Sequence, residues 1–175
     1  PTMNRPECID VLLEDIHVDL VKYDVDLWIY DTSPEKDTED VYNSYKQRHK
    51  AENIIYKRIN NYPDKTSDYK VINAIRELWD RYEYLWLSGD GICIKLDNVM
   101  ELLVDSFNNL VDVVHFNDKK NSKTEIITKY TDALQFFKNH ATHLTRYSTT
   151  IISSRLAKKI NWDSLVNKYR NTGFL

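Results

Sequence analysis

Glycine is scarce in this chain, and its scarcity constrains the fold more than any other feature of the sequence. Only three of the 175 residues are glycine, whereas average usage of about 7% would give about 12. Hairpins and tight strand-to-helix turns favour glycine because it adopts left-handed backbone conformations without steric cost. Helices need few such positions. The composition therefore predicts an all-α fold, an irregular bundle of about six to seven helices with at most one short β pair.

The length and composition favour one domain with its own core. A chain of 175 residues with 42% hydrophobic and 29% charged side chains is long enough to bury roughly 70% of its unfolded surface. We therefore expect a single helical domain over residues 1–175. Its breaks are expected in loops near residues 31–38, 61–67, 88–97 and 117–123 and in a bend near residues 145–152.

Apolar residues recur every three or four positions from residue 9 to residue 30. They are Ile9, Leu13, Ile16, Leu20, Tyr23, Leu27 and Tyr30. This spacing is typical of one apolar face of a long helix. The alternative is that residues 24–31, DVDLWIYD, alternate as a β-strand does.

Further helices are predicted from similar spacing and from residues suited to helix starts. The candidate N-caps are Ser33, Thr66 or Ser67, Asp97, Ser122 and Asn161. Ser and Asp side chains accept the free N–H groups of a first helical turn, and Ser122 has a capping-box partner in Glu125. The helices are expected over residues 34–59, 68–86, 98–114, 123–144, 151–160 and 162–171, and Gly173 is the expected stop of the last helix.

The stretch LWLSGDGICIKLDN, residues 85–98, holds two of the three glycines and is the first candidate for a ligand loop. Aligning Gly91 with the invariant glycine of a calcium loop puts Trp86 at the first ligand position, where calcium needs an oxygen. A phosphate-binding loop needs a preceding strand and a Gly-Lys pair, and neither is evident in the sequence. We therefore predict that Gly89 or Gly91 only terminates a helix.

No catalytic residue, metal site or cofactor is predicted. His140 and His143 lie three residues apart, but no Glu-x-x-His pattern or cysteine pair accompanies them. Cys93 beside Lys95 is better explained as a small buried hydrophobe than as an activated thiol. No Gly-x-Ser-x-Gly sequence positions a nucleophile. The sequence therefore predicts a protein that is not an enzyme.

Two cysteines without a disulfide pattern favour a reducing compartment. No window approaches eighteen apolar residues, and the first residues lack a basic start followed by an apolar run. We therefore expect an intracellular protein, cytoplasmic or nuclear, with no membrane contact.

Aromatic side chains form the first candidate for a partner surface. Trp79, Tyr82 and Trp86 follow helical spacing, and Trp28 adds a further large ring. Tryptophan and tyrosine are enriched at binding hot spots, although ordinary core packing is the alternative for each of them.

Charge is distributed unevenly along the chain. Residues 1–40 carry twelve acidic and three basic side chains, a net charge of −9, whereas residues 115–175 carry eleven basic and four acidic side chains, a net of +7. The candidate basic surface consists of Lys119, Lys120, Lys123, Arg146, Arg155, Lys158 and Lys159. Such asymmetry suits a charged partner, unless the two ends of the chain neutralise each other.

These patterns together predict a non-catalytic helical module for protein–protein interaction, an adaptor or complex subunit. The expected partner is a charge-complementary peptide or helix, and the long first helix is also compatible with a homodimer. The alternative is a nucleic-acid-binding domain that uses the basic C-terminal residues on phosphates. The sequence pI near 6.0 counts against this alternative.

Overall fold

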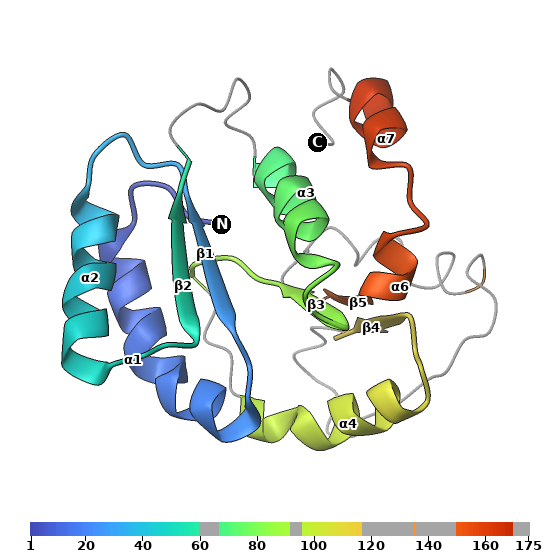
Figure 1. Ribbon diagram of the computed structural model, residues 1–175, viewed down its shortest axis with the longest axis horizontal. Coiled ribbons are helices and arrows are strands. Elements are labelled where there is room, and N and C mark those ends of the chain that lie inside the picture. The colour runs from blue at the N-terminus through green and yellow to red at the C-terminus, as the bar shows by residue number, and fades with distance from the viewer. Residues whose placement is uncertain (60–66, 92–95, 117–134, 136–149, 170–175) are drawn as a thin grey trace.

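A computed structural model describes residues 1–59, 67–91, 96–116, 135 and 150–169, and the fold is mixed α/β (Figure 1). Helices alternate with short strands, and the described strands form two small sheets. The predicted all-α bundle is therefore wrong. The residues that form strands are rich in β-branched and aromatic side chains, which fit a half-buried pleated surface.

The N-terminal part is a helix followed by a strand–helix–strand unit. It consists of α1 (Pro6–Tyr23), β1 (Leu27–Asp31), α2 (Asp37–His49) and β2 (Ile54–Arg58). The two strands are parallel, with Leu27 opposite Ile54 and Asp31 opposite Arg58. Figure 1 shows α1 and α2 on one side of this pair and α3 on the other.

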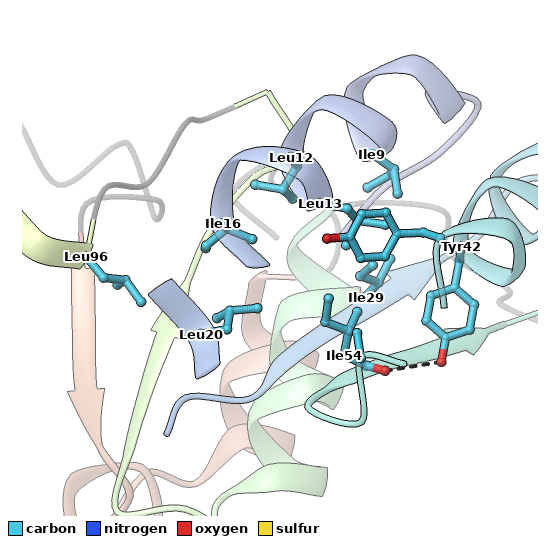
Figure 2. Packing of buried hydrophobic residues seen from close by; sticks show 11 residues of the cluster. Ile9, Leu12, Leu13, Ile16, Leu20, Ile29, Tyr42, Ile54 and Leu96 are labelled. Atoms are coloured by element: carbon cyan, nitrogen blue, oxygen red, sulfur yellow. Dashed lines mark hydrogen bonds between the residues drawn. The ribbon is translucent and has the colours of Figure 1, made fainter. Parts of the chain in front are cut away.

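The first core lies between α1, α2 and the β1–β2 pair (Figure 2). Ile29 points from β1 into this core, and Tyr42 of α2 donates its hydroxyl to the Ile54 carbonyl at 3.1 Å. The apolar face of α1 predicted from its spacing is buried here, at Ile9, Leu13, Ile16 and Leu20. Each such side chain contributes about 1.5–3 kcal/mol through burial.

The rest of the described chain forms a three-stranded sheet with flanking helices. Its elements are α3 (Ser67–Leu78), β3 (Tyr84–Leu87), the 3-10 helix η1 (Leu96–Asn98), α4 (Met100–Asn108), β4 (Val113–His115), β5 (Thr150–Ser153), α6 (Ser154–Ala157) and α7 (Trp162–Tyr169). The strand order is β3-β5-β4, and β5 is antiparallel to both neighbours.

A second core joins this sheet to the other face of β1. Tyr30 is buried there with Ile75 and Leu78 of α3, Leu85 of β3 and Ala157 of α6. Successive side chains of a strand point to opposite faces. Ile29 therefore belongs to the first core and Tyr30 to the second, so β1 is covered by helices on both sides.

Four predicted helices are too long because each runs into a strand. The first ends at Tyr23, so the alternative strand within residues 24–31 is the correct reading. The predicted helices over residues 34–59, 68–86 and 98–114 likewise run into β2, β3 and β4. The predicted helix over residues 151–160 divides into β5 and the short α6.

Only some of the predicted N-cap residues are correct. Asn161 caps α7 as expected, because its side-chain oxygen accepts the Ser164 N–H at 3.0 Å. By contrast, α2 follows Lys36 rather than Ser33, and α4 follows Val99 rather than Asp97. The predictions for residues 123–144, apart from residue 135, for Gly173 and for Cys93, His140 and His143 lie outside the described residues.

The inference from glycine fails because other residues take the left-handed positions. Asn4, Asp24, Lys50 and Leu110 have φ values between 50° and 54°. Asp24 and Lys50 end α1 and α2 immediately before the turns into β1 and β2. A chain can therefore connect helices to strands with few glycines, at a cost of roughly 1 kcal/mol for each such residue. No described helix is long and apolar enough to cross a membrane.

Candidate ligand site at the ends of the parallel strands

Buried polar groups gather where β1 ends. Asp31, the last residue of β1, has no exposed surface (0%). Its Oδ1 accepts the backbone N–H and the hydroxyl of Ser33 at 2.8 and 2.5 Å, and its Oδ2 accepts the Tyr56 hydroxyl at 2.5 Å. Burial, then the hydrogen bond to Asp31, raises the pKa of Tyr56. These donors are what a buried carboxylate requires.

Lys70 brings a positive charge to the same place from the first turns of α3. It is only 5% exposed, and its Nζ lies 3.3 Å from the Thr2 carbonyl oxygen. Burial lowers the pKa of the Lys70 ammonium, against the attraction of the Asp31 and Asp90 carboxylates. A buried lysine facing two carboxylates is costly to assemble, so the cluster is a candidate for function.

Asp90 reaches this cluster from the segment that follows β3. Its Oδ1 accepts a hydrogen bond from Arg5 Nη1 at 3.1 Å, and the Arg5 side chain is 58% exposed. Arg5 Nη1 also lies 3.9 Å from the position that a Cβ of Gly91 would take. Arg5 and Gly91 therefore form the solvent-facing side of a cluster in which Asp31 and Lys70 are buried and Asp90 is half-buried.

The first residues of the chain lie along β1 beside the cluster. Thr2 forms a parallel bridge with Asp31, donates its N–H to the Tyr30 carbonyl at 2.9 Å and accepts the Thr32 N–H at 3.3 Å. Asn4 donates its N–H to Ser33 Oγ at 2.8 Å. The buried Thr2 hydroxyl has no hydrogen-bond partner among the described residues.

The parallel pairing explains why these groups meet. Both strands of a strand–helix–strand unit end at the same edge, and the next helix begins there. Asp31 stands at the end of β1, and Lys70 lies near the start of the helix that follows β2. Ligands of open α/β sheets bind at the carboxyl ends of the strands, and a helix N-terminus there favours negative charge. The edge can therefore receive a polar ligand with an acidic group.

The structure separates the predicted aromatic surface into two parts. Trp28 donates its Nε1–H to the Tyr82 hydroxyl at 2.8 Å, and that hydroxyl donates to Asp26 Oδ2 at 2.6 Å. Burial raises the pKa of Tyr82. Trp79 packs against the same second core, whereas Trp86 packs against the first core. Because α3 ends at Leu78, the three rings do not form one helical stripe.

The predicted basic surface is described only in part. Arg155 donates to Asp112 at 2.7 Å and Lys158 lies 2.7 Å from Asp80, while Lys159 is exposed. Ion pairs between described residues link acidic N-terminal residues to the α2–β2 part of the chain, as in Arg48–Glu14 and Arg58–Glu39. The remaining residues of the predicted surface lie outside the described residues: Lys119, Lys120, Lys123 and Arg146.

Within the described residues, no three His, Cys, Asp or Glu side chains come close enough together to hold a metal ion. No family model, curated protein or solved structure matches this chain. The candidate site is therefore identified from its geometry alone.

Sequence reasoning missed Asp31, Lys70 and Asp90, because they are far apart in the chain and meet only in the folded structure. Two signals could have pointed to them. The alternating run that ends in Asp31 is followed at once by Thr32 and Ser33, which is typical of a polar loop after a strand. Asp90 follows a strand rather than a helix, so the preceding strand that a ligand loop requires is present after all.

Proposed function

We propose that this chain binds a small polar ligand that carries an acidic group at the carboxyl end of β1 and β2. The observation that carries the proposal is the burial of Lys70 beside Asp31 and Asp90 at that edge. Removing charges from water is expensive, and α/β proteins concentrate such charges where their ligands bind. In this proposal, Lys70 and the start of α3 attract the acidic group, and the half-buried Asp90 carboxylate accepts a hydrogen bond from a hydroxyl group of the ligand.

The solvent-facing side of the cluster supports the proposal. Arg5 and Gly91 lie next to Asp90, on the side from which a ligand would approach. Arginine also provides several hydrogen-bond donors in the planar geometry that suits phosphates and carboxylates.

A thermal-shift experiment tests the proposal. The purified chain is heated with inorganic phosphate, a sugar phosphate or a nucleoside diphosphate, and calorimetry measures the affinity of any compound that raises the melting temperature. A ligand at one hundred times its dissociation constant stabilises the folded state by about 2.7 kcal/mol. We expect Lys70→Met and Arg5→Gln each to weaken that stabilisation.

The matched control is Lys22→Gln. Lys22 is an exposed cation that also pairs with a carboxylate, Asp97, but at the other end of α1. The Lys22→Gln substitution should leave ligand binding unchanged. The proposal fails if no compound of the panel shifts the melting temperature, or if the shift persists in both Lys70→Met and Arg5→Gln.

The protein–protein interaction function predicted from the sequence also remains our proposal, without its helical-bundle fold. Trp28 and Tyr82 already form a hydrogen bond with each other. The centre of the Trp28 ring also lies 5.2 Å from the Arg81 guanidinium. Nucleic-acid binding stays the alternative. For that function Arg155 and Lys158 would have to exchange their carboxylate partners for phosphates.

A further inference from the structure

Helix α1 has a second apolar side that faces solvent. Its inner side is buried in the first core, yet Val11, Val18 and Val21 are 62%, 69% and 64% exposed. Valine is a weaker helix former than alanine because its branched side chain loses rotamer freedom in a helix. Three exposed valines therefore lower the intrinsic stability of α1 without packing against the rest of the described fold.

The three valines fall on one line along the helix. Residues 11, 14, 18 and 21 are separated by three, four and three positions, the spacing of a helix-pairing seam. Three of these four positions are valine and the remaining one is Glu14. We call Val11, Glu14, Val18 and Val21 the outer seam of α1. A seam of this kind is complementary to the apolar face of another helix.

Acidic side chains border the outer seam. Glu7 and Asp10 are exposed on the same side of the helix as Val11 and Val18. Arg48 of α2 lies 3.3 Å from Glu14 and 3.9 Å from Asp10. Arg48 supplies one positive charge against the three negative charges of Glu7, Asp10 and Glu14, so this surface keeps a net negative charge. If a second copy of this chain bound here, acidic side chains would face acidic side chains. A basic helix would neutralise them instead.

We infer that the outer seam of α1 binds an amphipathic basic helix of a partner protein. The partner's apolar residues would cover Val11, Val18 and Val21, and its Lys or Arg side chains would pair with Glu7, Asp10 and Glu14. This surface is distinct from the ligand site, which lies at the end of β1. The inference therefore stands or falls independently of the proposed ligand.

A pair of designed peptides tests the inference. One helical peptide carries leucine at the first and fourth positions of each seven-residue repeat, flanked by lysine, and the second carries glutamate in place of lysine. Fluorescence anisotropy measures the binding of each labelled peptide to the full chain. We expect the lysine peptide to bind at least about tenfold more tightly than the glutamate peptide, and less tightly as salt is added.

Two exposed valines provide a matched comparison. Val18→Asp places a charge in the middle of the outer seam, whereas Val104→Asp places it on α4, where Val104 is 48% exposed. Val18→Asp should weaken binding of the lysine peptide about tenfold or more, and Val104→Asp should not. Val11→Asp is the second seam variant, and far-UV circular dichroism confirms that each variant folds.

Three results would overturn the inference. The first is a failure of the wild-type chain to bind the lysine peptide. The second is equal binding by the Val18→Asp and Val104→Asp variants, which would indicate a nonspecific charge effect. The third is self-association in sedimentation experiments that Val18→Asp abolishes, because the outer seam would then bind a second copy.

Discussion

Lys70 illustrates how a single buried charge depends on its surroundings. Its ammonium is removed from water by the first residues of the chain and by the end of β1, and burial lowers its pKa from the ordinary value of 10.5. The protonated form is therefore less favourable in the folded state than in the unfolded chain. Asp31 and Asp90 offset only part of this cost.

The lowered pKa predicts how stability depends on pH. Between the folded pKa of Lys70 and 10.5, the unfolded chain holds a proton that the folded chain has released. Folding is therefore favoured by raising the pH across that window, and the cost of burial is fully present below it. Urea unfolding at several pH values should show the wild-type chain gaining stability relative to Lys70→Met as the pH rises.

Burial lowers the pKa of the Pro1 amino group and the Lys70 charge lowers it further, so the difference between the two proteins reports on Lys70 together with its effect on Pro1. A difference in stability that stays constant from neutral pH to pH 10.5, or falls with rising pH, would contradict the burial of a charged lysine.

At the scale of elements, the ends of α1 and α2 determine where the parallel strands begin. Asp24 and Lys50 adopt left-handed conformations, and each returns its backbone N–H to the last turn of its helix. Both helices are followed within a few residues by a strand. These residues bear the steric cost that glycine would avoid.

Replacing Lys50 by glycine should therefore stabilise the chain. The relief of left-handed strain, roughly 1 kcal/mol, is partly offset by the greater freedom of glycine in the unfolded state, which leaves about 0.5 kcal/mol. Chemical denaturation measures the change. Lys50→Ala is the control, because alanine removes the same side chain and keeps the strain, so equal effects of the two substitutions would contradict the explanation.

The same helix ends show which parts of the fold could be predicted. The spacing of Ile9, Leu13, Ile16 and Leu20 identifies α1 correctly, because one face of a helix meets one core. The spacing then continues by chance to Leu27 and Tyr30, which lie on opposite faces of β1. Local periodicity cannot distinguish a strand buried on both faces from a buried turn of helix.

The candidate site was less accessible to prediction than the helices. Asp31, Lys70 and Asp90 lie at least twenty sequence positions apart, and only the folding of the chain brings them together. A strand assignment for residues 27–31 would have placed Asp31 at a sheet edge. Nothing in the local sequence around Lys70 indicates that its side chain is buried.

At the scale of the whole molecule, β1 joins the two cores. Ile29 is buried in the first and Tyr30 in the second, so neither core is complete without this strand. Tyr30 also donates its hydroxyl to Glu77 of α3 at 3.0 Å. The two parts of the fold share a central element and are expected to lose their structure together.

Unfolding should therefore occur in a single transition. Tryptophan fluorescence, which reports on Trp28, Trp79, Trp86 and Trp162, and far-UV circular dichroism should give the same midpoint in urea. Ile29→Ala should lower both midpoints to the same extent, even though its side chain lies in only one core. Two separate transitions would show that the cores are independent.

The position of β5 between β3 and β4 has a consequence for how the chain folds as it is synthesised. The strands β1 and β2 are joined by one helix, so the first sheet can pair as soon as Arg58 has left the ribosome. Among the described strands, β3 and β4 both pair with β5, which becomes available only once Thr150–Ser153 has been made. Until then their backbone groups stay open to wrong pairing. The first core can thus serve as a template on which the later sheet assembles.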